Sequence, residues 1–172
     1  MSVWIKNIPP VQFSAIFFEM ENGDVAITME KFPRSRERGG EMIVCVCGLI
    51  GSGKSTFCKE QEGIISDYDL IGDKNRQIKF TLIQDAKGKT VYHITCYPTP
   101  KEREAFEGKN VRYIWINTSW RQCYDNIFKR KRKRDMQNIE VVLSSNLDYL
   151  KKFERTNIPF EIIDIFRTDE KW

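Results

Sequence analysis

The sequence has no long hydrophobic run, and this absence argues against a protein that spans a membrane with helices. No stretch of 18 consecutive apolar residues occurs in its 172 residues, although 41% of them are hydrophobic. A helix that crosses a membrane needs about 20 such residues, so we expect no membrane span. The first ten residues also lack the charged and then apolar pattern of a secretory signal peptide. We therefore expect a cytoplasmic protein.

Histidine is almost absent, and the cysteines form no metal-binding pattern. His93 is the single histidine, and none of the five cysteines belongs to a CxxC pair. Structural zinc sites are built from four Cys or His ligands at short spacings, so the sequence predicts no zinc site. We interpret the cysteines as buried, reduced thiols. His93 is interpreted as a core residue, with a general base as the alternative.

An excess of positive over negative charge is absent outside one short segment. The net charge is +4, from 28 basic and 24 acidic residues, and residues 129–134 read KRKRKR. Without those six residues, 22 basic side chains would stand against 24 acidic ones. The chain is therefore basic in one place and not over its whole surface.

The N-terminal quarter of the chain differs in pattern from the rest. Two β-prone runs before residue 33 flank Asn22-Gly23, the strongest short signal for a hairpin turn. A polar stretch that ends in two glycines follows and is typical of a connector. We expect residues 1–41 to form a β-hairpin extension with its connector and residues 42–172 to form the main domain.

From residue 42 onward, short apolar runs alternate with helical patterns. We expect strands at residues 42–48, 64–66, 90–96, 111–117 and 160–166. We expect helices from Ser55 to about residue 62, from an Asp73 cap to about residue 87, from Pro100, from a Thr118 or Ser119 cap into the basic segment, and over residues 139–156. Strands that alternate with helices form parallel sheets covered by helices. The sequence therefore predicts an α/β fold with a central parallel sheet of about five strands.

A glycine-rich stretch carries the clearest chemical signal. Residues 48–55, GLIGSGKS, fit the pattern G-x-x-x-x-G-K-[ST] of the phosphate-binding P-loop and lie between an expected strand and an expected helix. Glycines let backbone N–H groups turn toward phosphate oxygens, and the following helix adds its positive N-terminal end. In this pattern the lysine reaches the β- and γ-phosphates and the final hydroxyl binds Mg²⁺. The predicted binding residues for ATP, with GTP as an open alternative, are Gly48, Gly51, Ser52, Gly53, Lys54, Ser55 and Thr56, with Ser55 as the Mg²⁺ ligand.

Two acidic residues follow the second expected strand of the sheet. Asp67 and Asp69 come directly after residues 64–66, which places them at the carboxyl edge of a parallel sheet, beside the P-loop. A carboxylate there can orient or deprotonate an acceptor hydroxyl, or hold the water shell of a metal ion. An ordinary solvated acidic loop is the alternative.

Three roles remain open for the basic segment at residues 129–134. Arginines at the end of a helix can close over phosphates and stabilise charge during transfer. The same segment could contact nucleic acid, or it could be a solvated helix end.

Several segments together resemble the P-loop kinase superfamily over residues 42–166. The closest part of that superfamily contains phage-type polynucleotide 5′-kinases and related small ATP-dependent kinases. The resemblance implies the P-loop kinase fold and ATP- and Mg²⁺-dependent phosphate transfer. It is carried by CVCGLIGSGKST, IISDYD, KGKTVYHITCYPTPKEREAF, VRYIWINTSWRQCYDNIFKRKRKRD and FERTNIPFEIIDI.

The resemblance also implies roles for residues outside the P-loop. In that family the aspartate after the second strand activates the acceptor hydroxyl, which corresponds here to Asp67 or else to Asp69. The segment after the third strand shapes the acceptor pocket, so Arg103 becomes a candidate acceptor contact. The arginine-bearing lid follows the fourth strand and corresponds to Arg130, Arg132 and Arg134.

Three hypotheses of function follow. The first is an ATP- and Mg²⁺-dependent kinase that phosphorylates a hydroxyl of a polynucleotide or nucleotide, with Lys54 and the lid arginines stabilising charge. The second is a nucleoside-monophosphate or small-metabolite kinase of the same fold, favoured by the short interval between Asp69 and the third strand. The third is a nucleotide-dependent binding or regulatory module without transfer, favoured by Thr95 and Cys96 where related kinases usually carry an aspartate.

Overall fold

A computed structural model describes residues 13–19, 25–31 and 42–165, and the chain divides into two units, residues 1–39 and 40–172. In the first unit, β1 (Phe13–Glu19) and β2 (Val25–Lys31) pair antiparallel. The pairing runs from Phe13 opposite Lys31 to Glu19 opposite Val25, which is a hairpin. The predicted Asn22-Gly23 turn and the connector lie outside the described residues.

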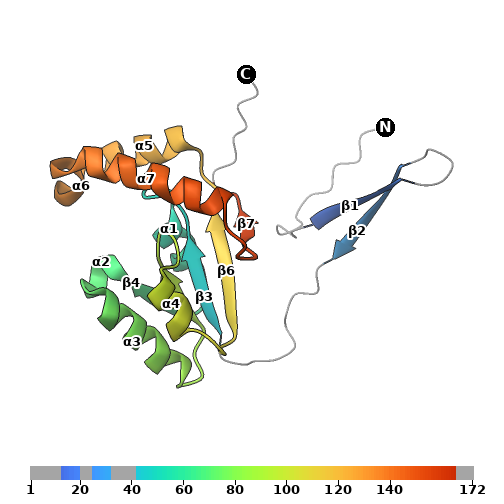
Figure 1. The fold of residues 1–172 in the computed structure, drawn as a ribbon, viewed down its shortest axis with the longest axis horizontal. Coiled ribbons are helices and arrows are strands. Elements are labelled where there is room, and N and C mark those ends of the chain that lie inside the picture. The colour runs from blue at the N-terminus through green and yellow to red at the C-terminus, as the bar shows by residue number, and fades with distance from the viewer. Residues whose placement is uncertain (1–12, 20–24, 32–41, 166–172) are drawn as a thin grey trace. The chain divides into compact units, whose positions relative to one another are not determined.

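The second unit is built around a parallel sheet of five strands (Figure 1). Its order is β4-β5-β3-β6-β7, and every neighbouring pair is parallel. The predicted α/β fold with a five-stranded parallel sheet flanked by helices is therefore confirmed. The strands are β3 (Ile43–Cys47), β4 (Ile64–Asp67), β5 (Val91–Ile94), β6 (Val111–Ile116) and β7 (Glu161–Ile163).

Seven helices lie in the described part of this unit, and side-chain caps fix where several of them begin. Asp73, Thr99 and Ser119 each accept a hydrogen bond from the backbone N–H three residues ahead, as predicted for Asp73 and Ser119. The helices are α1 (Lys54–Lys59), α2 (Tyr68–Ile71), α3 (Lys74–Asp85), α4 (Pro100–Ala105), α5 (Trp120–Arg130), α6 (Lys133–Gln137) and α7 (Ile139–Glu154).

The helix expected to run into the basic segment does so and ends at Arg130, because Lys131 takes a left-handed conformation with φ 48° that breaks the helical ladder. The structure differs from the predicted elements at two places. α2 and α6 were not predicted, since four or five residues are too few to show a helical period. The last strand covers three residues instead of the predicted seven.

β3 is buried on both faces, and this fixes the core. On one face Val44 and Val46 pack with Cys58 of α1. On the other, Cys45 and Cys47 pack with Trp115, which stacks on Phe153 of α7 with ring centroids 4.0 Å apart. No helix in the described residues is long and apolar enough to cross a membrane.

Candidate functional site

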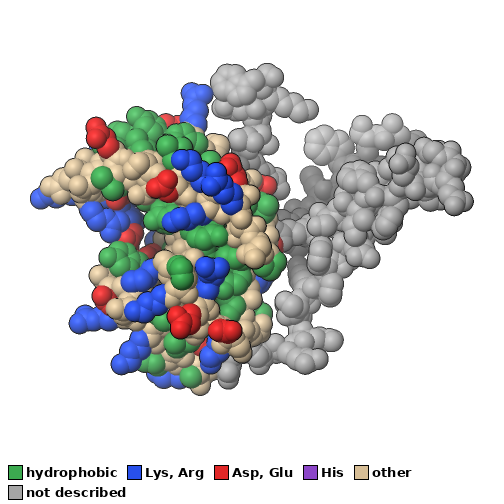
Figure 2. Space-filling model, in the orientation of Figure 1, with side chains coloured by type: hydrophobic (Ala, Val, Ile, Leu, Met, Phe, Trp, Pro, Cys, Tyr) green, Lys and Arg blue, Asp and Glu red, His purple; other side chains and the backbone are tan. Residues whose placement is uncertain are grey.

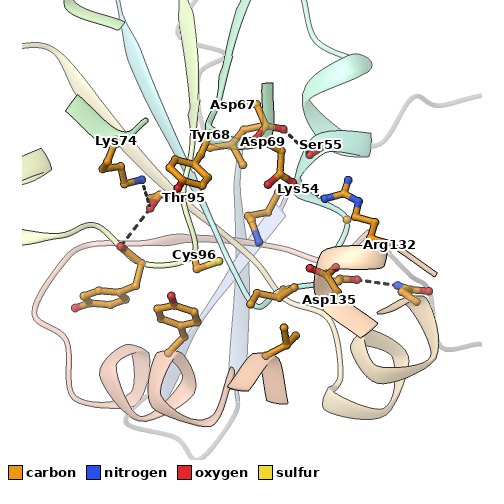
Figure 3. Close-up of a pocket in the computed structure, with 18 of the residues that line it drawn as sticks. Lys54, Ser55, Asp67, Tyr68, Asp69, Lys74, Thr95, Cys96, Arg132 and Asp135 are labelled. Carbon is orange, nitrogen blue, oxygen red and sulfur yellow. Dashed lines mark hydrogen bonds and ion pairs between the residues drawn. The ribbon is translucent and has the colours of Figure 1, made fainter. Parts of the chain in front are cut away.

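A cavity of about 1230 Å³ opens where the parallel strands end (Figure 3). This volume exceeds the ~300–1,000 Å³ of typical small-molecule sites, so the cavity has room for more than one ligand. Its walls come from the glycine-rich loop (residues 48–55) and α1, from the segments after β4 and β5, and from α5, α6 and α7. The molecular surface shows a notch between α5–α7 and α2–α4, with Lys and Arg side chains on both sides of it (Figure 2).

The glycine-rich loop joins β3 to α1 and needs glycine for two reasons. Gly51 has φ 87°, a conformation that other residues rarely adopt. A Cβ atom on Gly51 would also lie 2.5 Å from the carbonyl oxygen of Cys123 in α5. The loop is therefore packed directly against α5.

Lys54 is the first residue of α1, and its side chain folds back over the loop. Its Nζ donates hydrogen bonds to the carbonyl oxygens of Gly48 at 2.8 Å and Leu49 at 2.7 Å. The ammonium group is thereby held at the cavity wall. The first N–H groups of α1 have no partners within the helix. The arrangement is suited to an anion.

Ser55 and Asp67, predicted separately, meet at the end of β4 (Figure 3). The Ser55 hydroxyl donates to Asp67 Oδ2 at 3.0 Å, and Asp67 Oδ1 accepts from the backbone N–H of Asp69 at 2.9 Å. Within residues 42–165, no group of three or more His, Cys, Asp and Glu side chains could hold a metal ion by itself. A hydroxyl beside a carboxylate nevertheless supplies the oxygen ligands that Mg²⁺ prefers, and Mg²⁺ takes its remaining ligands from phosphates and water.

Asp69 does not stand free at the cavity edge but pairs with the arginine segment. It forms ion pairs with Arg132 and, at 3.0 Å, with Arg134. Partial burial alone would raise the pKa of Asp69, but the hydrogen bonds and charges of the two arginines lower it below its ordinary value. A carboxylate with a lowered pKa is a poor proton acceptor, so this geometry argues against Asp69 as a general base.

The third predicted lid arginine has a different partner. Arg130 forms an ion pair with Asp135, whose side chain is 2% exposed, and Arg134 reaches the same carboxylate at 3.5 Å. All three arginines line the cavity. The basic segment therefore folds back onto two carboxylates at the cavity and is not a bare solvated helix end.

Lys74 was missed by the sequence reasoning, although it lines the cavity. Its Nζ lies 2.7 Å from Glu102 Oε1, 3.1 Å from Gln77 Oε1 and 3.2 Å from Thr95 Oγ1. A fixed ammonium group thus stands at the end of β5, beside Thr95. Its position at the start of a helix after an Asp cap gave no sign of this role.

Glu102 and His93 form a buried pair behind Lys74. His93 Nε2 lies 2.7 Å from Glu102 Oε1, both side chains are 0% exposed, and Thr81 Oγ1 lies 2.8 Å from His93 Nδ1. Burial would raise the pKa of Glu102, but His93 and Lys74 lower it to about 2. Burial lowers the pKa of His93, partly offset by Glu102. His93 is therefore a satisfied core residue, as predicted, and the general-base alternative is wrong.

The remaining predicted residues divide into two groups. Thr56, Arg103 and the partly exposed Cys96 line the cavity, as do Gly51 and Gly53. Gly48 and Ser52 are not among the described lining residues, and the Ser52 side chain is fully buried. Cys96 thus departs from the prediction of five buried thiols, whereas the other four are buried.

The sequence matches no protein-family model and no curated protein. We therefore infer function from the geometry of the cavity.

Proposed function

We propose that the chain is an ATP- and Mg²⁺-dependent phosphotransferase that moves the γ-phosphate of ATP to a hydroxyl of a polynucleotide or nucleotide. The observation that carries this proposal is the 3.0 Å contact between Ser55 and Asp67. It joins the end of the glycine-rich loop to the end of β4 on the same cavity that Arg132 and Arg134 line.

The glycine-rich loop is the proposed phosphate site. The N–H groups at the start of α1, together with the positive end of the helix, favour a phosphate. Lys54 would exchange its two loop carbonyls for phosphate oxygens, which are stronger acceptors for an ammonium group. The start of α1 and the Lys54 ammonium group would both attract the negative charge that ATP already carries.

The side-chain oxygens of Ser55 and Asp67 are suitable ligands for a bound Mg²⁺. When bound, the ion supplies positive charge that neutralises the phosphates and orients them. Ser55 would hold it directly, with Asp67 beside it.

In the proposed transfer, the acceptor hydroxyl oxygen attacks the γ-phosphorus and the bond from that phosphorus to the bridging oxygen of ADP breaks. The hydroxyl proton passes to Asp67, which among the described residues has no ion-pair partner, unlike Asp69. Arg132 and Arg134 would leave Asp69 to stabilise the charge on the transferred group.

The test is transfer of labelled γ-phosphate from ATP to a panel of 5′-hydroxyl DNA and RNA oligonucleotides, nucleosides and nucleoside monophosphates. We expect label on at least one acceptor, and Lys54→Met should lower the rate by at least about 100-fold, because it removes a charge that stabilises the transition state. Lys59→Met, an exposed lysine of the same helix, is the matched control and should leave the rate unchanged. ATP binding without transfer to any acceptor would instead support the binding-module hypothesis.

Lys74 favours a second candidate, a nucleoside-monophosphate or small-metabolite kinase. A fixed ammonium group at the end of β5 suits an acceptor that brings its own anionic group close to the transferred phosphate. Saturation of transfer by a mononucleotide, with no gain from an oligonucleotide, would support this candidate. Higher kcat/KM for oligonucleotides would reject it.

A further inference from the structure

The first five carbonyl groups of the glycine-rich loop, from Gly48 to Ser52, all accept hydrogen bonds from side chains. Lys54 holds the first two, and the next three accept from side chains of distant elements. The three bonds are Asn146 Nδ2 to Ile50 at 3.0 Å, Asn126 Nδ2 to Gly51 at 2.8 Å, and Thr118 Oγ1 to Ser52 at 2.8 Å.

These bonds decide which way the loop N–H groups point. In a trans peptide the C=O and the following N–H point in opposite directions. A carbonyl held by Asn146 therefore turns the N–H of Gly51 the other way, and a carbonyl held by Thr118 does the same for Gly53. Both glycines line the cavity, so their N–H groups are directed toward the place of a bound anion.

Asn146 makes the most complete of these contacts. Its Oδ1 accepts from the Ile50 N–H at 2.6 Å while its Nδ2 donates to the Ile50 C=O, across 96 residues of sequence. The residue is 1% exposed, and an amide is the side chain that offers a donor and an acceptor side by side. Asn146 itself is not among the residues that line the cavity.

The two asparagines also belong to the helices on either side of the basic segment. Asn126 lies in α5, which ends at Arg130, and Asn146 lies in α7, which begins at Ile139. Both helices that support the lid arginines are thereby tied to adjacent peptides of the glycine-rich loop.

We propose that Asn146 is a positioning residue for nucleotide binding: it holds the Ile50 peptide so that the Gly51 N–H faces the phosphates, and it fixes α7 to the loop. This inference rests on the proposed nucleotide-binding role of the loop. It extends that role to a residue that does not touch the ligand.

The experiment measures the affinity of the full chain for ATP and for inorganic tripolyphosphate by titration calorimetry, together with unfolding in urea without ligand. Asn146→Leu removes both hydrogen bonds at similar volume. Leu150→Ala is the matched control, because the Leu150 side chain packs α7 against the core but has no polar atom that could hold a loop peptide. Asn146→Ala removes both hydrogen bonds without adding bulk or charge and decides the question if the leucine variant does not fold.

We expect Asn146→Leu and Asn146→Ala to bind both ligands at least about tenfold more weakly. Leu150→Ala should bind both like the wild type even where it is equally destabilised. A folded Asn146 variant with wild-type affinity for tripolyphosphate would overturn the inference and leave the proposed function standing. A wild-type protein that binds neither ligand would overturn both.

Discussion

At the scale of single residues, the protein buries the carboxylate of Glu102 beside its cavity and offsets the cost of the buried charge with ion pairs and hydrogen bonds. Glu102 accepts from Lys74 and lies against neutral His93, while its second oxygen accepts from the Thr99 N–H at 2.7 Å. Buried charge is costly unless it is paired and hydrogen-bonded. Glu102 is fully buried and does not line the cavity, yet it holds Lys74 in place at the cavity wall.

Glu102→Gln should therefore destabilise the protein. We expect a loss of about 3 kcal/mol in the free energy of unfolding at pH 7, because Lys74 and His93 lose their anionic partner. The folded-state pKa of Glu102 is lowered from 4.5 to about 2, so its contribution is present above pH 4.5 and is lost as the pH falls toward 2. Urea unfolding at several pH values measures this, with the exposed Glu104→Gln as control; an equal loss for both variants would contradict the network.

Asp69 gives a second prediction at this scale. Asp69→Asn removes the partner of Arg132 and Arg134, so amide hydrogens of residues 131–138 should exchange a few-fold faster at pH 7, in line with the modest strength of exposed ion pairs. Because the pKa of Asp69 is lowered from 3.8, the difference from wild type should persist above that pH and vanish as the pH falls below it. Asp148→Asn, an exposed carboxylate of α7, is the charge-matched control. Unchanged exchange in Asp69→Asn would show that the pair does not hold the segment.

At the scale of elements, the glycine-rich loop and α5 form one packed unit. Gly51 touches the backbone of Cys123, and Asn126 of the same helix holds the Gly51 carbonyl. The loop therefore cannot move without α5, and α5 leads directly into the arginine segment. A ligand that moved the loop would therefore also move the start of the arginine segment.

Gly51→Ala tests that contact against a matched glycine. Gly72 has a similar φ of 78°, but a Cβ atom there would meet nothing within 4 Å. Gly72→Ala should cost about 1 kcal/mol of unfolding free energy from backbone strain alone. Gly51→Ala should cost several times more and abolish ATP binding, because the new methyl group overlaps a backbone carbonyl. Equal effects on stability and binding in urea unfolding and calorimetry would rule out close packing as the reason for Gly51.

At the scale of the whole unit, the cavity exists because five parallel strands end at one edge. Residues from the segments after β3, β4 and β5 meet there, and α5, α6 and α7 close the other side. The three arginines of residues 129–134 are directed at this cavity, toward Asp69 and Asp135. A lid over phosphates agrees with that orientation better than a surface for nucleic acid does.

Changing Arg130, Arg132 and Arg134 together to glutamine distinguishes the two roles. For a lid, turnover should fall by at least about 100-fold, whereas the dependence of oligonucleotide affinity on salt should keep its slope. A triple variant of exposed arginines outside the cavity, Arg76, Arg121 and Arg155, controls for net charge. A flatter salt dependence with unchanged turnover would assign the segment to nucleic-acid contact.

The sequence by itself determined the features that depend on neighbours in the chain. Alternating apolar runs and caps gave the order of strands and helices, because a buried strand and an Asp or Ser cap are local properties. The glycine-rich loop was recognisable for the same reason, since its backbone conformation restricts residues one by one. The interruption at Lys131 escaped prediction, because nothing in KRKRKR favours a left-handed residue at its third position.

The tertiary structure alone decided which side chains meet. Ser55 contacts Asp67, Asp69 meets Arg132 across 63 residues, and Asn146 reaches Ile50 across 96. Such contacts depend on the strand order β4-β5-β3-β6-β7, which brings segments together irrespective of their distance in sequence. The hydrophobic pattern of the sequence does not reveal this strand order, because the order results from packing helices on both faces of β3. The candidate phosphate site was therefore visible in the sequence, whereas its supports in α5, α7 and Glu102 appeared only in the fold.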